Sequence, residues 1–387
     1  MLFVFKYLTY TLSLADSIFG LPFSVPDIAL PIGISFFTFQ AMSYVIDSYK
    51  SPELIRKNIL DIFLYISFFP QLIAGPIIKF DDIAGQISYR TITSEKTVEG
   101  IRRFVCGLAK KILIANAMGE VADAAFAVDA SSLNVVAAWI GAICYVVQIY
   151  FDFSGYSDMA IGLGKMFGFE FKENFNYPLA CNGMTDFWRK WNISVSTWFK
   201  EYVYIPLGGN RKGKLRTAIN KIIVFILTGV WHGANLTFLL WGIIHGFFLM
   251  LENYNVVPKK PFAKKLLAPL GHLYSLLVIT FTFVIFRADN ISYAFSYIKA
   301  MFCGWDFSVN SGFPEIISML SAYLVIAFVI GLFISTPIVP KFRAFMCNNG
   351  KAQLYYVGAS ICSLILFVVC ILALSTATYN PFIYFRF

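Results

Sequence analysis

The chain has 387 residues, of which 58% are apolar and 14% are charged, and Phe alone accounts for 41 of them. A water-soluble domain exposes a large share of its residues and has a charged fraction of about a quarter. The composition therefore excludes soluble enzymes, disordered tails and secreted disulfide scaffolds, and it favours a polytopic membrane protein. The net charge of +9 comes from short basic clusters between apolar runs, which is typical of cytoplasmic loops and not of nucleic-acid binding.

Apolar runs bounded by charged residues or by Pro and Gly predict the membrane helices. At about 20 residues per span, the length allows about nine to eleven membrane segments. The runs lie near 2–19, 30–47, 59–79, 132–151, 217–231, 235–252, 266–286, 315–337 and 353–376. No stretch keeps the strict alternation of a strand, so we predict an all-α membrane protein with one domain over 1–387.

Some segments depart from a simple membrane span. Residues 97–126 mix apolar stretches with Lys and Arg, which predicts a helix that is partly interfacial. The sequence FFPQLIAGPI (68–77) has two prolines and a glycine, which predicts a broken or re-entrant segment lining protein or a cavity. Lys and Arg are densest in 189–216, so we predict that this region is cytoplasmic; a second basic stretch covers 259–265.

The segment DFWRKWNISVSTWFKEYVY (186–204) has helical periodicity. A single helix places five residues on one face: Trp188, Trp191, Val195, Trp198 and Tyr202. Asp186 is then expected to cap or charge the helix N-terminus. One interpretation is an interfacial amphipathic helix anchored by its aromatic residues. Asn192 does not fit it well, because burying an unpaired amide beside the stripe costs about 1–3 kcal/mol; Ser196 lies one turn further on.

The sequence TGVWHG contains Trp231 and His232, and His232 is one of three histidines. One interpretation is a structural core histidine. The other is a catalytic group, because the flanking glycines break the helix and apolar surroundings keep the imidazole neutral. His245 follows 13 residues later, and an interruption at 233–235 brings the two rings onto compatible faces. We interpret His272 as structural.

The segment FDFSGYSDMAIGLGKMFGF (151–169) places Asp152 and Asp158 six residues apart beside an apolar run. A metal site is one alternative, but no histidine is nearby, so capping or pairing with Lys or Arg is favoured. The seven cysteines contain no C-x-x-C pair and indicate neither a disulfide framework nor a metal site. From the residues alone, the best-supported chemistry is a neutral histidine in a membrane cavity with an amide and aromatic walls nearby.

Taken in order with NFNYPL and YIPLGGNR, these motifs resemble the membrane-bound O-acyltransferase (MBOAT) family. Within it the chain is similar to the bacterial alginate O-acetyltransferase branch, with the teichoic-acid D-alanyltransferases as cousins. The resemblance is strong over 30–250. It implies membrane helices and re-entrant or interfacial helices around a central tunnel. Typical relatives begin with several more membrane helices, so we expect the chain to lack part of their N-terminal region.

By this resemblance His232 is the catalytic residue, and Asn192 occupies the last position of the family motif F-W-x-x-W-[HN]. Bacterial alginate-type members usually have His there, whereas eukaryotic lipid-acylating members have Asn. Other residues are expected to support the site: His245, Trp188, Trp191, Ser196, Trp231 and Asp186. Basic side chains are expected to attract the phosphates of the donor: Arg189, Lys190, Lys200, Arg211 and Lys212.

The resemblance implies an O-acetyltransferase that uses a cytoplasmic acyl thioester, acetyl-CoA, and holds no bound cofactor or metal. The implied acceptor is a hydroxyl of an exported cell-envelope polysaccharide. The implied location is the inner (cytoplasmic) membrane, with a periplasmic SGNH-type acetyltransferase as partner and no nucleic acid. The alternatives are D-alanyl transfer to teichoic acid and a non-catalytic transporter or scaffold in polysaccharide export.

Overall fold

The structure is a computed structural model that describes residues 2–20, 24–26, 28–73, 75–257 and 268–376. Over these residues it consists of helices and loops without a strand. The predicted all-α class is therefore confirmed for the described part of the chain.

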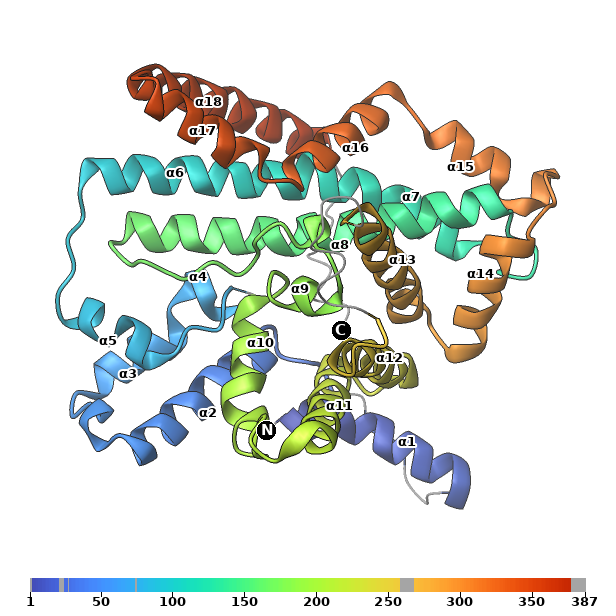
Figure 1. The fold of residues 1–387 in the computed structure, drawn as a ribbon, viewed down its shortest axis with the longest axis horizontal. Helices are drawn as coiled ribbons and strands as arrows, with labels where there is room; N and C mark the ends of the chain where they lie inside the picture. Colours follow the sequence, from blue (N-terminus) through green and yellow to red (C-terminus); the bar gives the residue numbers. More distant parts are fainter. Residues whose placement is uncertain (1, 21–23, 27, 74, 258–267, 377–387) are drawn as a thin grey trace.

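A long helix, α8 (Val135–Met166), forms the centre of the molecule. A nearly continuous rod runs beside it (Figure 1), made of α6 (Ser94–Ala109), a π-helical turn (Lys110–Ala115) and α7 (Asn116–Ala127). The two rods approach backbone to backbone: a Cβ added at Gly107 would lie 2.5 Å from the carbonyl oxygen of Gly155. The helical structure predicted over 97–126 is confirmed, and its partly interfacial position stays a prediction.

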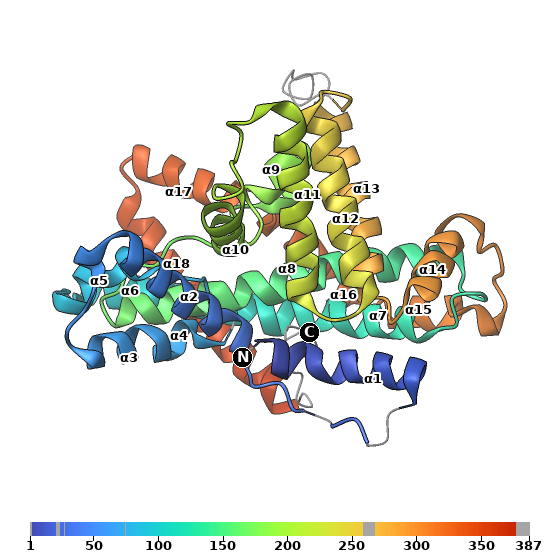
Figure 2. The same ribbon diagram turned by 90° about the horizontal axis from the view of Figure 1, so that it is seen from below.

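The helices α11 (Gly213–His232) and α12 (Leu236–Asn253) form a hairpin that stands across the α6–α8 rods, with α13 (Ala268–Arg287) beside it (Figure 2). A Cβ added at Gly242 would lie 2.2 Å from the carbonyl oxygen of Phe225, so only glycine permits this close crossing. Helix α14 (Ile291–Cys303) follows α13. The hairpin turn carries the predicted catalytic histidine.

The N-terminal part of the chain packs around the base of this hairpin. A π-helical turn (Phe3–Tyr7) and α1 (Leu8–Phe19) lie at the turn between α11 and α12 (Figure 2). The next helices are α2 (Ile34–Lys50), α3 (Ile59–Ser67), α4 (Phe69–Leu72) and α5 (Phe80–Ser88).

The broken segment predicted over 68–77 is confirmed. Helix α3 ends at Ser67, and Pro70 stands at the start of the four-residue α4. The side-chain Nε2 of Gln71 is buried and donates to the carbonyl oxygen of Tyr65 at 2.5 Å, which satisfies a backbone group that the break leaves free.

The C-terminal part begins with α15 (Phe313–Met319) and α16 (Ala322–Ile334), which are bent by 78° relative to each other. Helix α17 (Ile338–Asn348) follows, and α18 (Ala352–Thr376) packs along α6 (Figure 1).

Four described helices are long and apolar enough to cross a membrane: α8, α12, α13 and α18. The bent pair of α15 and α16 adds a fifth if it forms one span. The polytopic membrane class is thus confirmed, but fewer long helices occur among the described residues than the predicted nine to eleven. Two apolar runs form shorter pieces instead, since 59–79 is divided between α3 and α4 and 315–337 between α15 and α16. The basic stretch 259–265 lies outside the described residues.

Candidate active site

The single helix predicted over 186–204 is wrong. The segment forms α9 (Met184–Trp188), α10 (Ile193–Phe199) and a π-helical turn (Lys200–Tyr204). The helical conformation is interrupted at Asn192. Its φ of 42° lies in the left-handed region, which Asn tolerates better than most residues. A break here reorients the side chains on either side of Asn192.

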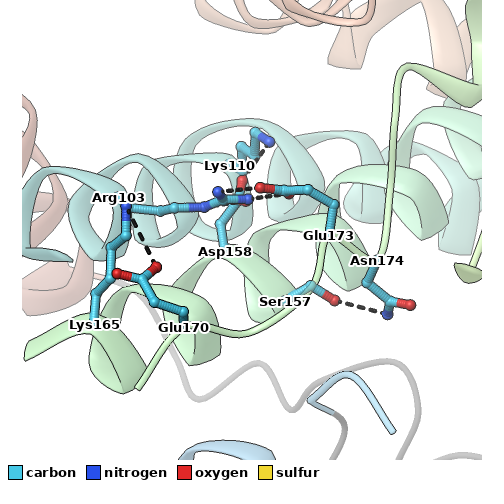
Figure 3. Close-up of polar contacts among 8 residues, drawn as sticks. All are labelled: Arg103, Lys110, Ser157, Asp158, Lys165, Glu170, Glu173 and Asn174. Atoms are coloured by element: carbon cyan, nitrogen blue, oxygen red, sulfur yellow. Dashed lines mark hydrogen bonds and ion pairs between the residues drawn. The ribbon is translucent and has the colours of Figure 1, made fainter. Parts of the chain in front are cut away.

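The break is held by Asn174, which is 0% exposed. Its backbone oxygen accepts from the N–H of Ile193 at 2.9 Å, and its Oδ1 accepts from the N–H of Ser194 at 3.0 Å. These bonds replace the carbonyl partners that a continuous helix would supply. Asn174 Nδ2 also donates to Ser157 Oγ at 3.1 Å, as Figure 3 shows. Asn174 therefore connects α8 to the turn at Asn192.

An ion-pair network fixes the loop that carries Asn174 (Figure 3). Arg103 of α6 pairs with Asp158 at 2.7 Å and with Glu173 at 2.5 Å, and Lys110 pairs with Asp158 at 2.6 Å. Asp152 pairs with Lys111 at 2.5 Å. The predicted pairing of both α8 aspartates with basic residues is confirmed.

The break divides the predicted aromatic stripe between two clusters. Trp191 packs in the central cluster, where its ring centroid lies 5.4 Å from that of Phe283. Trp198 packs in a second cluster and stacks on Phe39 at 3.9 Å. Asn192 lies between Trp191 and Trp198 in the chain and is 4% exposed, and its Oδ1 has no hydrogen-bond partner among the described residues. The structure thus buries an amide oxygen where the chain passes from one aromatic cluster to the other.

The N-terminus of α9 is capped by Glu252, a residue the sequence analysis missed. Glu252 is buried at the end of α12; its carboxylate accepts from the N–H of Met184 at 2.5 Å and of Thr185 at 2.9 Å. Asp186 does not cap the first-turn N–H groups, because its carboxylate accepts from the N–H of Asn182 and pairs with Lys190. It does lie in the first turn of α9, so the alternative prediction, a negative charge at this helix N-terminus, is confirmed. In the sequence, the only indication of this capping role is that Glu252 is an acidic residue at the end of an apolar run.

His232 is the last residue of α11 and is 8% exposed. Its ring centroid lies 4.8 Å from Trp231, 5.2 Å from Trp241 and 5.0 Å from Phe286. The predicted interruption is confirmed, because α12 begins only at Leu236. The imidazole is therefore enclosed by aromatic rings at a helix end.

His245 is buried on α12, and its Nδ1 accepts from Trp188 Nε1 at 3.3 Å. The Trp241 ring contacts both histidines, since its centroid lies 4.7 Å from that of His245 and 5.2 Å from that of His232. His272 is separate from this group, and its Nδ1 lies 2.9 Å from the carbonyl oxygen of Cys181. Trp241 was not singled out from the sequence, although it lies on the same helix as His245.

Two chains of aromatic contacts connect the α9–α10 region to His232. The first runs through Trp188 and Trp241, whose centroids are 5.7 Å apart. The second runs from Trp191 through Phe283 to Phe286, with centroid distances of 5.4 and 6.2 Å. These contacts form a continuous set of aromatic rings from Trp188 and Trp191 to His232.

A cavity of about 490 Å³ lies at the turn between α11 and α12. Phe238 and Phe286, whose rings contact that of His232, contribute to its wall, whereas His232 itself does not line it. A smaller cavity of about 110 Å³ lies beside α10 and is lined in part by Ser194 and Thr197. The central tunnel expected to join the two sides of the membrane stays a prediction.

The remaining predicted residues occupy different surroundings. Ser196 is close to Asn192, because its N–H donates to the Asn192 carbonyl oxygen at 3.0 Å. Four basic residues are exposed: Arg189, Lys200, Arg211 and Lys212. Lys190 instead pairs with Asp186 at 2.8 Å, so its charge is partly neutralised.

A buried histidine near a cavity, with a buried amide and aromatic walls, defines a class of membrane-embedded proteins suited to general-base group transfer. The family model described as membrane-bound O-acyltransferase family matches residues 1–282. The chain belongs to this family and is a membrane-bound acyltransferase.

Curated relatives carry acyl-transferring names. The chain is 39% identical to the probable alginate O-acetylase of Azotobacter vinelandii over 412 residues, covering 99% of this chain and 82% of that protein. It is 36% identical to the peptidoglycan O-acetyltransferase of Helicobacter pylori, covering 77% of this chain and 61% of that protein. It is 27% identical to the teichoic acid D-alanyltransferase of Bacillus subtilis, covering 66% of this chain and 67% of that protein.

Proposed function

We propose that the protein transfers an acetyl group from a cytoplasmic thioester, acetyl-CoA, to a hydroxyl of an exported cell-envelope polysaccharide. The observation that carries this proposal is the enclosed imidazole of His232 at the end of α11, near a cavity, in a member of the O-acyltransferase family. Identity to a probable alginate O-acetylase supports acetyl as the acyl group and a polysaccharide as the acceptor.

In the proposed reaction, His232 acts as the general base. It takes the proton of the acceptor hydroxyl while the oxygen attacks the thioester carbonyl carbon. The carbon–sulfur bond then breaks, and the imidazolium returns the proton to the leaving thiolate. The products are an acetyl ester and a free thiol. General-base catalysis of this kind contributes about 10²–10⁴-fold to the rate.

The proposal assigns Asn192 to orientation of the acyl carbonyl, with its side-chain N–H donating to the developing oxyanion. An amide fixed before the reaction stabilises that charge without reorganisation. The buried position of Asn192 and the left-handed turn that Asn174 holds support this assignment. The aromatic walls formed by Trp188, Trp191 and Trp241 exclude water, which would otherwise hydrolyse the thioester.

The basic residues around the start of α11 support a proposed orientation of the protein in the membrane. Exposed Arg211 and Lys212 precede this helix, and Arg189 and Lys200 are exposed nearby in the chain. In the proposed arrangement they face the cytoplasm and attract the phosphates of acetyl-CoA. The protein then resides in the cytoplasmic membrane, and an SGNH-type acetyltransferase on the far side is the proposed partner.

The second candidate is D-alanyl transfer to teichoic acid, which the lower identity to the Bacillus subtilis enzyme supports less well. Purified protein given labelled acetyl-CoA and extracted envelope glycans separates them. We expect label transfer by the wild type and by the control variant His272→Ala, and loss of transfer in His232→Ala at unchanged membrane expression. Transfer at the wild-type rate by His232→Ala would remove His232 from the mechanism.

A further inference from the structure

The C-terminal helices meet α6 at a cluster of aromatic and basic side chains. Helix α18 packs along α6, and α17 precedes α18 and contacts it (Figure 1). Helix α18 is long and apolar enough to cross a membrane, and Tyr355 and Tyr356 lie within its first two turns. Tyrosine is enriched where membrane helices meet the aqueous phase. The start of α18 is therefore expected at the membrane–water interface.

Helix α17 has the pattern of a helix that lies in this interface. Within the described protein, none of its residues is buried. Its exposed apolar residues recur with helical spacing: Ile338, Val339, Phe342 and Phe345. Lys341 and Arg343 lie at the two edges of the apolar face that this spacing forms. Such a helix places its apolar face among the acyl chains and its basic side chains among the headgroups.

Two arginines from different helices contact Tyr356. Arg343 of α17 donates from Nη2 to the Tyr356 hydroxyl at 2.8 Å, and its guanidinium carbon lies 5.5 Å from the ring centroid. Arg102 of α6 donates from Nη1 to the backbone oxygen of Tyr356 at 3.4 Å, and its guanidinium carbon lies 5.2 Å from the same centroid. One tyrosine therefore holds two guanidinium groups from distant parts of the chain as a pair.

Neither member of this arginine pair forms an ion pair with a carboxylate of the described residues. Glu99, one turn before Arg102, interacts with both guanidinium groups at longer range, but its ion pair is with Lys165 at 2.8 Å. The adjacent Arg103, in contrast, pairs with two carboxylates. Like charges held close together repel each other, and a bound anion removes this repulsion.

The segment between α16 and α18 (335–351) has basic residues and no acidic one. The basic residues are Lys341, Arg343 and Lys351. Short basic segments next to membrane helices lie on the cytoplasmic side. The lipid surface on that side is negative, and basic pockets between membrane helices there bind anionic headgroups. The charge of the arginine pair thus matches the lipid surface in which this segment is expected.

We propose that Arg102 and Arg343 form a headgroup site for an anionic phospholipid, whose phosphodiester is the anion that the described chain does not supply. A guanidinium group has several N–H donors in one plane, an arrangement that matches phosphate oxygens, and each of the two uses one of them on Tyr356. The exposed apolar face of α17 suits the acyl chains, which a free phosphate lacks. This site goes beyond the proposed function and does not depend on it.

The test measures binding of fluorescently labelled phosphatidylglycerol to the purified full chain in neutral detergent. Phosphatidylcholine with the same label and acyl chains is the zwitterionic comparison. We expect the wild type to bind phosphatidylglycerol about tenfold more tightly than phosphatidylcholine. Arg102→Gln and Arg343→Gln should each lower the affinity for phosphatidylglycerol about tenfold and remove most of the preference. Lys341→Gln is the matched control, because it removes the same charge from an exposed position of α17, and its effect should be several-fold smaller.

Equal wild-type affinities for the two lipids would overturn the inference, and this comparison needs no variant to fold. An equal loss of affinity in Lys341→Gln and Arg343→Gln would also overturn it, because the attraction would then belong to the basic surface of α17 as a whole. Glycerophosphoglycerol, the same headgroup without acyl chains, should compete far more weakly than unlabelled phosphatidylglycerol. Competition of equal strength would show a site for a free anion and would overturn the assignment to a lipid.

Discussion

Replacing Asn174 tests whether the turn at Asn192 is held by the contacts described above. The change Asn174→Ala removes the acceptor of the Ser194 N–H and the donor to Ser157 Oγ, both in a buried site. A buried polar group left without its partner costs about 1–3 kcal/mol, so two such groups cost roughly 2–6 kcal/mol. The left-handed conformation of Asn192 itself costs about 1–2 kcal/mol and needs this support.

The expected result is a loss of catalytic rate larger than the loss of folded protein. A reorientation of the Asn192 amide that forfeits about 1.4–2.8 kcal/mol in the transition state lowers kcat about 10- to 100-fold. The assay compares kcat per folded protein with the thermal unfolding midpoint in detergent.

Ser157→Ala is the matched control, because it removes the partner of Asn174 Nδ2 but leaves the bond to the Ser194 N–H intact. Its kcat should change several-fold less than that of Asn174→Ala. If Asn174→Ala lowers the unfolding midpoint while kcat per folded protein is unchanged, Asn174 does not position the catalytic amide.

Two further predictions concern the close crossing of α11 and α12 and the cap that Glu252 of α12 provides for α9. Gly242→Ala should cost about 1–3 kcal/mol and lower the unfolding midpoint, because its Cβ would lie 2.2 Å from a backbone oxygen. The control Gly358→Ala on α18, whose added Cβ meets no other part of the described chain within 4 Å, should be neutral or slightly stabilising. Equal effects of the two changes would contradict the close crossing. Glu252→Ala should lower the unfolding midpoint by removing the acceptor of two N–H groups of α9, and Glu252→Gln, which keeps one acceptor oxygen, should lower it less. Unfolding midpoints equal to that of the wild type in both Glu252 variants would show that the cap contributes nothing.

Local chemistry explains which parts of the fold could be predicted from the sequence. Pro70 removes a backbone N–H and interrupts the apolar run, so the break there is visible in the residues themselves. The interruption after His232 could also be predicted, because Gly233 and Asn235 lie within the next three residues. No histidine lies near Asp158 in the chain, whereas basic residues are available. An ion pair with a basic residue lowers the free-energy cost of burying its carboxylate, so this pairing could be predicted.

The features that were missed depend on partners far away in the chain. The periodicity of 186–204 is helical, and only the bonds from Asn174 make a left-handed break at Asn192 favourable. Glu252 caps a helix that lies 67 and 68 residues earlier in the chain, which no local pattern indicates. Among the described residues, four helices are long and apolar enough to cross a membrane by themselves, fewer than the nine to eleven predicted segments, since hydropathy does not distinguish one span from two shorter helices.

The most direct test of the central proposal is a single-turnover measurement of acetyl transfer by equal amounts of folded wild type, His232→Gln and His232→Ala. If His232 is the general base, both variants should lose about 10²–10⁴-fold in rate while keeping the wild-type unfolding midpoint. A variant that transfers acetyl as fast as the wild type would contradict the proposed mechanism.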